Sequence, residues 1–287
     1  MRISKKYKPI EEYIKHSLAF EKESVDTLCS HESRKDLGHK VWHTVDSLWN
    51  KNHELVNEWI TERAETFVES HRDYSENDKL EILYQARKFA LKDSYETNGV
   101  IICYEAIIHS HFDVMEKLDW FLYGNACYEP AEFAGRPLTE NPFEKAIFAF
   151  SHLLPTEDPK ILKKYGIALF RLGNYNEAFQ MLHFVKDNPE MDTEIYLDIA
   201  LLYEEMGFFE DVEILMRKSI KETDFWSFKN KLADALVAQG KEEEAIGWYT
   251  VALKQDDIQE NKPAQEMIAQ KLGNLLKGKI DDETSTN

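Results

Sequence analysis

Residues Leu162–Leu182 read LKKYGIALFRLGNYNEAFQML, and this stretch decides the fold. Its Gly173 is the first of three glycines, with Gly207 and Gly240 following at intervals of 34 and 33 residues. Five residues after each glycine stands a small or branched residue: Ala178, Val212 and Ala245. A fixed period of this length is the signature of stacked helical hairpins. The pattern therefore predicts an array of hairpins, which binds a ligand with a surface more often than it transforms one in a pocket.

Composition favours the same class. The chain has 287 residues, of which 43% are hydrophobic and 12% aromatic, enough for a large core and one to three domains. It contains only 8 prolines and 11 glycines, and β-branched alternation is scarce. We therefore predict an all-α protein. No run approaches the ~18 apolar residues of a membrane span, and no apolar segment follows the basic N-terminus, so we expect a cytoplasmic protein.

Charge and cysteine content narrow the partners. The net charge is −18, and clustered Lys and Arg are missing, which disfavours nucleic acid and anionic membranes as partners. Basic or apolar protein segments suit such a chain better, although acidity can also serve solubility alone. The three cysteines are far apart and form no Cys-x-x-Cys pair, so reduced thiols are expected and neither a disulfide framework nor a zinc ribbon is.

Each period repeats one motif across two helices. The first repeat has Leu162-x-x-Tyr165-Gly166-x-x-Leu169, then Ala178-x-x-x-Leu182. The second has Tyr196-x-x-Ile199-Ala200-x-x-Tyr203, then Val212-x-x-x-Met216. The third has Lys229-x-x-Leu232-Ala233-x-x-Leu236, then Ala245-x-x-x-Tyr249. These residues resemble the tetratricopeptide repeat (TPR) family over about 120 residues. The small residues fall where the two helices of a hairpin approach closely, while Val212 and Lys229 depart from the family pattern.

The predicted organisation has an N-terminal helical bundle followed by a TPR α-solenoid with a C-terminal capping helix. Residues 1–98 form the bundle, with helices expected at 10–29, 37–71 and 78–97. Residues 99–157 form a divergent helical hairpin, with helices at 100–123 and 142–154 and a long inserted loop at 124–141. Residues 158–277 hold three repeats and a capping helix at 264–276, whose apolar stripe packs on the stack. Residues 278–287 form a polar tail that we expect to be disordered.

The bundle contains two groups that could carry chemistry. His39, His43 and Asp46 share one face of a helix and are weak candidates for a metal site, although the solvated side of an amphipathic helix explains them equally simply. Arg34 with His39 has the Arg-x4-His spacing that resembles HEPN-type helical ribonucleases. We expect no metal, no cofactor and no catalytic residue from these patterns.

A third group lies in the most apolar segment. Glu105 and His109 are four residues apart, with His111 just beyond. A carboxylate in such a segment must be paired or shift its pKa. We predict a Glu–His hydrogen bond within the core, or a Glu at its rim, and keep catalysis as an alternative.

The TPR resemblance implies a concave groove lined by the first helix of each hairpin. The resemblance places the following residues in this groove: Lys160, Lys163, Ile167, Phe170, Arg171, Glu194, Leu197, Leu201, Glu204, Glu205, Asn230 and Asp234. Ile167 and Asp198 stand where the subfamily that clamps heat-shock chaperone tails would have Asn, which argues against that function. The apolar residues suit a helix or extended peptide, and the glutamates suit a ligand that carries Lys or Arg.

The sequence thus predicts an adaptor or regulator that binds a peptide or helix of a partner protein, with a homodimer possible. One alternative is a chaperone for an exported or aggregation-prone client. Another is an N-terminal helical enzyme, metal-dependent or HEPN-like, that carries a TPR targeting module. The N-terminal bundle could also fill the groove itself.

Overall fold

The computed structural model describes residues 3–23, 52–73, 75–92, 96–110, 113–134, 138–185, 195–259 and 261–285. Over these residues the chain is all-α, as the sequence predicts, and no strand occurs among them. The chain divides into two compact units, Met1–Thr156 and Glu157–Asn287.

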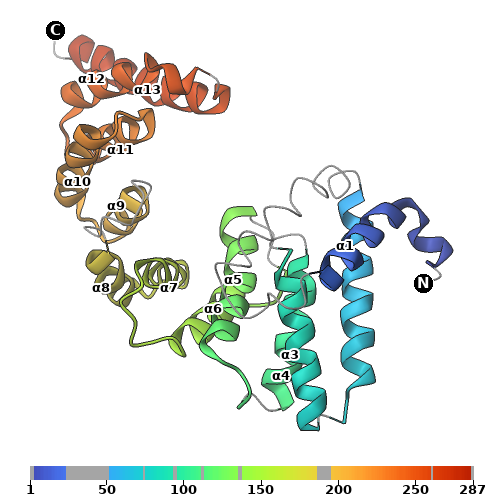
Figure 1. The fold of residues 1–287 in the computed structure, drawn as a ribbon. Coiled ribbons are helices and arrows are strands. Elements are labelled where there is room, and N and C mark those ends of the chain that lie inside the picture. The colour runs from blue at the N-terminus through green and yellow to red at the C-terminus, as the bar shows by residue number, and fades with distance from the viewer. Residues whose placement is uncertain are drawn as a thin grey trace. The chain divides into compact units, whose positions relative to one another are not determined.

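The N-terminal unit is a set of packed helices. They are η1 (Lys5–Ile10), α1 (Glu11–Glu23), a helix at residues 52–70, α3 (Glu76–Ala90), α4 (Thr97–Ser110), α5 (Lys117–Ala134) and α6 (Pro142–Ser151). The helix at 52–70 runs beside α3 and α4, and α1 lies across one end of this layer (Figure 1). The predicted apolar face of the helix at 52–70 is confirmed at two of its residues, because Val56 is 0% and Trp59 is 6% exposed.

Three predicted helix boundaries near residues 76–97 are wrong. The third helix ends at Ala90 and not at 97, and α4 begins at Thr97 and not at 100. Helix α3 begins at Glu76, two residues before the predicted start, because the hydroxyl of its N-cap Ser75 and the Asp78 carboxylate form a reciprocal capping box.

The predicted loop at 124–141 is also wrong in its first part. The helix predicted at 100–123 is also wrong, because α4 ends at Ser110 and α5 begins at Lys117. Residues 124–134 continue α5, and α5 is the helix that pairs with α6. The segment contains Gly124 and Pro130, and glycine and proline are ordinarily loop signals. Gly124 is tolerated because α6 approaches it closely: a Cβ there would lie 2.5 Å from Cε1 of Phe150. Packing against Phe150 offsets the cost of about 1 kcal/mol that glycine carries inside a helix.

The α5–α6 hairpin repeats the motif of the first TPR. It has Trp120-x-x-Tyr123-Gly124-x-x-Cys127, then Ala146-x-x-x-Phe150. Gly124 meets Phe150 as Gly166 meets Leu182, where a Cβ would lie 2.8 Å from the leucine side chain. The longer connection between the two helices breaks the period of the motif, so the period alone did not reveal this hairpin.

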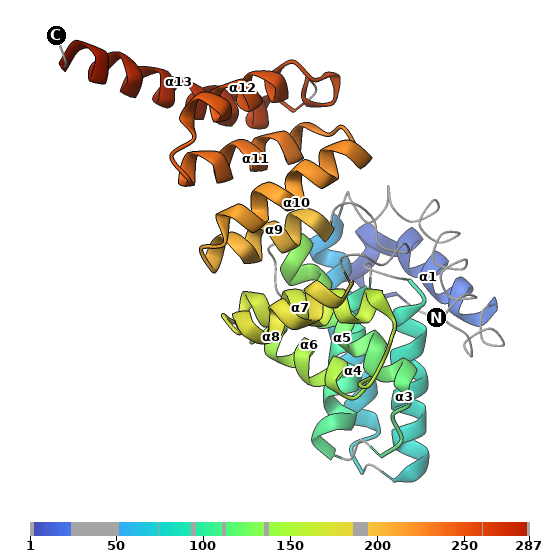
Figure 2. The same cartoon turned by 90° about the vertical axis from the view of Figure 1, so that its left-hand side faces the viewer.

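The C-terminal unit consists of successive antiparallel hairpins. Its elements are α7 (Pro159–Arg171), α8 (Tyr175–Val185), α9 (Ile195–Glu205), α10 (Phe209–Glu222), α11 (Trp226–Ala238), α12 (Glu242–Leu253), η4 (Asp256–Ile258) and α13 (Lys262–Ser285). Helices α7 and α8, α9 and α10, and α11 and α12 form the hairpins, and α13 packs on α12. Figure 2 shows the layers from α9 to α13.

The three periodic glycines end the first helix of each hairpin. Gly173, Gly207 and Gly240 have φ of 78°, 77° and 74°, the left-handed region that favours glycine. Each turn closes with the same pair of backbone hydrogen bonds. In the first turn the Asn174 N–H donates to the Leu169 carbonyl and the Gly173 N–H to the Phe170 carbonyl, both at 2.9 Å.

The small residues of the motif are packed as predicted. Ala178, Ala200, Ala233 and Ala245 are 0% exposed, and Val212, bulky for its position, is also 0% exposed. Lys229, the polar departure, is buried along its stem, and its ammonium reaches Asp224 at 2.5 Å. A lysine can occupy this apolar position because its charged end snorkels to an exposed carboxylate.

The capping helix is longer than predicted. It spans Lys262–Ser285 and not 264–276, so residues 278–285 are helical where a disordered tail was expected. Of the predicted apolar stripe, Ile268 is 0% exposed and packs on the stack, whereas Leu276 at its end is 44% exposed.

Candidate functional site

The predicted groove residues differ in how open they are. Phe170, Leu197 and Leu201 are half-buried, whereas Lys160, Arg171 and Glu205 are exposed. Ile167 was expected on the groove floor, but it is only 4% exposed and is a packed residue. Glu194 lies outside the described residues. The accessible apolar surface at these positions therefore comes from Phe170 on α7 and from Leu197 and Leu201, one turn apart on α9.

Three ion pairs connect α7 to α9, α9 to α11, and α11 to the capping helix α13. The Lys163 ammonium of α7 lies 3.4 Å from the Asp198 carboxylate of α9. The Lys231 ammonium of α11 donates to Glu204 of α9 at 2.8 Å. The Lys271 ammonium of α13 donates to Asp234 of α11 at 2.7 Å. We call these three pairs the inner-face ladder.

The inner-face ladder pairs several charged residues that the sequence assigns to the predicted groove. Side chains of the pairs are 16 to 34% exposed, so water screens them only in part. The carboxylates of Glu204 and Asp234 are paired with Lys231 and Lys271 of this chain. The sequence had assigned Glu204 to a cationic ligand. Among the described groove carboxylates, Glu205 is the exposed one.

Asn230 and Asp234 hold the capping helix. Asp234 accepts a hydrogen bond from the Tyr249 hydroxyl at 2.5 Å, and both Asn230 and Asp234 accept from Lys271. Burial and the bond to Asp234 raise the pKa of Tyr249. These two predicted groove residues therefore have a structural task at the junction of α11, α12 and α13.

The candidate metal ligands His39, His43 and Asp46, and the Arg34–His39 pair, lie outside the described residues. Within the described ranges, no group of three His, Cys, Asp or Glu side chains could hold a metal ion. Likewise, none of the helices described has the length and apolarity needed to cross a membrane.

The predicted Glu105–His109 hydrogen bond is wrong. Glu105 accepts from Lys145 of α6 at 2.7 Å and from the Thr139 hydroxyl at 3.1 Å, while the His109 ring bonds the Glu105 main-chain carbonyl. Glu105 is thus at the rim of the core, the second prediction made for it. His111 lies outside the described residues.

Sequence reasoning missed a buried charge cluster in the N-terminal unit. Arg63 donates to both carboxylate oxygens of Glu21 at 2.8 and 2.6 Å, and Lys92 donates to Glu21 and, at 2.8 Å, to Glu96. The Glu96 side chain is 0% exposed and Lys92 is 1% exposed. The only sequence signal was the four-residue spacing of Lys92 and Glu96, because the other partners come from distant helices.

Both described cysteines are free, buried thiols. Burial raises the pKa of Cys103 and of Cys127 to about 12. Neither is a thiolate at neutral pH, so neither has the character of a nucleophile or metal ligand.

Comparison with known proteins supports the fold. No family model and no curated protein matches the chain. Among solved structures, the crystal structure of MamA is similar, with a TM-score of 0.51 and 16% identity over 64% of this chain and 94% of MamA. A second crystal structure of MamA has a TM-score of 0.48 and 17% identity over 58% of this chain and 92% of that one.

The fold is TPR-like. MamA is a TPR-type protein, and at this identity the likeness concerns the fold alone. The 64% of the chain that is matched exceeds the C-terminal unit, so the matched residues include part of the N-terminal unit. The TPR motif of the α5–α6 hairpin agrees with that extent.

Proposed function

We propose that this protein binds a segment of a partner protein on the inner face formed by α7, α9 and α11. The observation that carries the proposal is the combination of half-buried Phe170, Leu197 and Leu201 with carboxylates and lysines already paired in the inner-face ladder. Because these charged groups are already paired, we expect such a surface to bind a ligand mainly through apolar contacts. An apolar helix face or an extended apolar peptide is the matching ligand.

Charge has a secondary part in this proposal. Glu205 is exposed beside the apolar residues and favours a partner with Lys or Arg at one end of its apolar segment. Because the other described groove carboxylates are paired internally, we expect affinity to depend only weakly on salt. Electrostatically driven binding would instead weaken steeply once ionic strength shortens the Debye length from about 30 Å to about 8 Å.

The test begins with affinity purification from the native host, followed by titration of the purified partner against the full chain. Leu201→Lys should weaken binding at least about 30-fold, near the 2 kcal/mol that marks a central contact. Ile214→Lys is the matched control, since Ile214 is 69% exposed on α10, the second helix of its hairpin. Equal binding by both variants would exclude the inner face as the binding surface.

The chaperone and enzyme alternatives remain hypotheses from the sequence. The part of the chain that the structure describes adds no observation in favour of either.

A further inference from the structure

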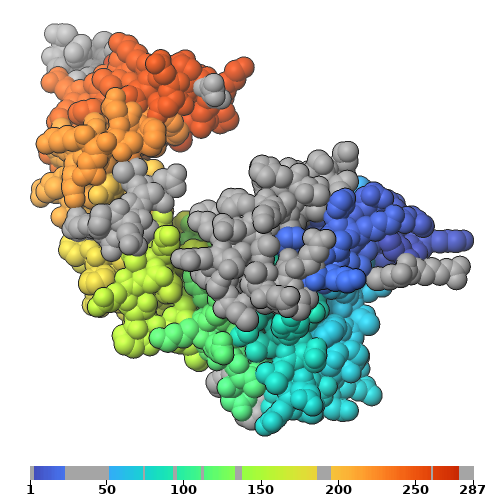
Figure 3. All heavy atoms as spheres, viewed as in Figure 1, coloured from blue at the N-terminus to red at the C-terminus, as the bar shows by residue number. Residues whose placement is uncertain are grey.

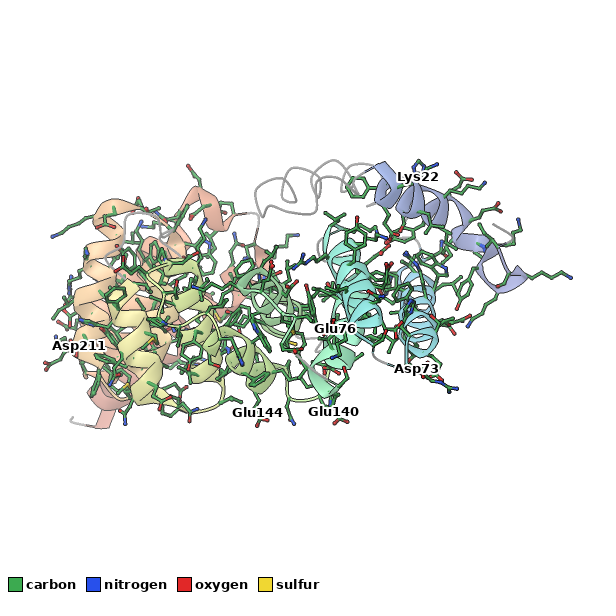
Figure 4. All side chains as sticks on the ribbon, turned by 60° about the horizontal axis from the view of Figure 1, so that its bottom comes forward. Lys22, Asp73, Glu76, Glu140, Glu144 and Asp211 are labelled. Atoms are coloured by element: carbon green, nitrogen blue, oxygen red, sulfur yellow. The ribbon has the colours of Figure 1, made fainter. Side chains whose placement is uncertain are left out.

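The contact between α1 and the rest of the N-terminal unit is partly polar. One face of α1 presents Tyr13, Ser17 and Glu21, which are 1%, 1% and 7% exposed. The neighbouring Lys22 is exposed and points outward (Figure 4), and the outer side of α1 is open at the surface of the unit (Figure 3). The buried face of α1 therefore carries a phenol, a hydroxyl and a carboxylate at intervals of four residues, beside the apolar side chain of Ile14, which is 1% exposed.

Each of these groups has a partner on another element. The Tyr13 ring meets Trp59 edge to face at 6.2 Å. The Tyr13 and Ser17 hydroxyls donate to Glu96 at 3.2 and 2.7 Å. Glu21 accepts from Arg63 and Lys92. The polar groups of α1 thus meet a fixed set of donors and acceptors on the bundle.

The surface beneath α1 would still present an aromatic ring and charged side chains if α1 were absent. It would present the Trp59 ring together with Arg63, Lys92 and Glu96. Arg63 lies over the Trp59 and Phe89 rings at 5.4 and 4.9 Å, so its guanidinium is held in place by more than Glu21. Two cations against one carboxylate leave this surface with one positive charge, which Glu21 neutralises.

A contact of this composition is easier to open than an apolar one. Buried ion pairs recover hydration when they separate, and the desolvation of charges offsets most of their mutual attraction. A helix of 13 residues is marginal by itself, so α1 unfolds when it leaves. Its opening is then a local event that does not require the rest of the unit to unfold.

We propose that α1 is a reversibly docked strap over a binding surface formed by Trp59, Arg63, Lys92 and Glu96. The occupant that this surface takes in place of α1 is an amphipathic partner helix with an aromatic residue, a hydroxyl and a carboxylate at the spacing of Tyr13, Ser17 and Glu21. The strap and the partner helix compete for the same ion pairs. This inference concerns the N-terminal unit and does not depend on the inner-face proposal.

Hydrogen exchange of the full wild-type chain tests whether the strap opens. Amides of α1 should exchange on the order of 100-fold faster than those of α4, since α1 opens locally and α4 only with the whole unit. Glu21→Gln should speed exchange in α1 and leave α4 unchanged. Glu12→Gln, which alters an exposed pair with Lys15 on α1, should change neither. Exchange of α1 and α4 at one common rate would overturn the proposal.

A labelled peptide of residues 3–23 tests the exposed surface. The Glu21→Lys chain repels its own strap from Arg63 and Lys92, so it should bind the wild-type peptide at least about 10-fold more tightly than the wild-type chain does. The wild-type chain binds weakly because its tethered α1 competes at an effective concentration on the order of millimolar. A peptide carrying Glu21→Lys should bind neither chain.

The Glu21→Lys chain could keep its α4 amides protected and still fail to bind the wild-type peptide. That result would refute the proposed binding surface. If that variant loses protection in α4 and therefore does not fold, Glu21→Gln replaces it as the acceptor. Rapid exchange of wild-type α1 without any peptide binding to Glu21→Gln would equally refute the surface.

Discussion

Lys92→Met is the sharpest test of the buried charge cluster. The Lys92 side chain is 1% exposed and its ammonium contacts Glu21 and Glu96, whose side chains are 9% and 0% exposed. Methionine keeps the length and much of the volume of the side chain but removes the charge. Glu21 would keep Arg63. Among the described residues, Glu96 would keep the hydroxyl donors Tyr13 and Ser17 and an Arg63 guanidinium nitrogen 3.9 Å away.

Two independent arguments give the size of the effect. Removing one partner from a buried ion pair costs about 3–5 kcal/mol, because a charge is left buried without compensation. Burial by itself raises the pKa of Glu21, but Lys92 and Arg63 together outweigh burial and lower that pKa from 4.5 to about 2. That difference corresponds to about 3 kcal/mol of stabilisation of the charged form, shared between the two cations. We expect Lys92→Met to lower the free energy of unfolding of the N-terminal unit by about 3 kcal/mol.

The pH dependence has a defined sign. A carboxyl whose folded pKa is lowered stabilises the fold above its unfolded pKa of 4.5, and this contribution is lost as the pH falls toward about 2. Without Lys92, burial acts on Glu21 with less opposition, so Glu21 accepts a proton more readily in the folded state of the variant. The stability difference between wild type and Lys92→Met should therefore be largest near neutral pH and should narrow below pH 4.5.

The slowest-exchanging amides of α3 and α4 measure this free energy in the N-terminal unit alone. Lys88→Met is the control, because Lys88 lies four residues earlier, in the last turn of α3, and its ammonium lies over the Tyr84 ring at 4.5 Å. It should change the free energy by no more than about 0.5 kcal/mol. A loss below about 1 kcal/mol for Lys92→Met, or a gap that widens on acidification, would refute the role given to Lys92.

Other predictions concern packing, thiols and the capping helix. Gly124→Ala should destabilise by about 1–3 kcal/mol in urea unfolding, because its Cβ would meet Phe150, whereas Gly247→Ala, with nothing within 4 Å of the new Cβ, should stabilise by about 0.5–1 kcal/mol. Opposite signs are required, and equal effects would contradict the close approach of α5 and α6. Cys103 and Cys127, whose pKa values burial raises to about 12, should resist iodoacetamide at pH 7.5 until the protein is unfolded, as mass spectrometry can follow; rapid labelling of the native chain would contradict their burial. Lys271→Met should speed hydrogen exchange in α13 by removing its bonds to Asp234, while Lys277→Met, at an exposed position, should not; similar rates in both variants would show that Lys271 does not hold the helix.

The repeat was predictable because its signals are local. A glycine with positive φ at the end of a helix and a small residue at a close approach each impose a requirement on one position, and the period makes those positions visible. The α5–α6 hairpin carries the same residues, yet the longer connection between its helices hides the period. The sequence alone therefore indicates a loop at Gly124, whereas the structure shows that Phe150 packs against it.

The candidate sites were less predictable. Family positions identified Leu197 and Leu201 as half-buried apolar residues, but not the fact that Glu204 and Asp234 are paired with Lys231 and Lys271. These partners are 27 and 37 residues away along the chain. The sequence does not distinguish a charged residue that is available to a ligand from one that forms an ion pair with a neighbouring helix.

By itself, the sequence determined the helical class, the hairpin turns at Gly173, Gly207 and Gly240, and the packing positions between paired helices. Backbone conformation and steric size at single positions are sufficient for those features. Only the tertiary structure decided the pairing of α5 with α6, the inner-face ladder, and the cluster of Glu21, Arg63, Lys92 and Glu96. Those depend on which distant side chains share a low-dielectric space, and the energy of a charge there depends on every neighbour at once.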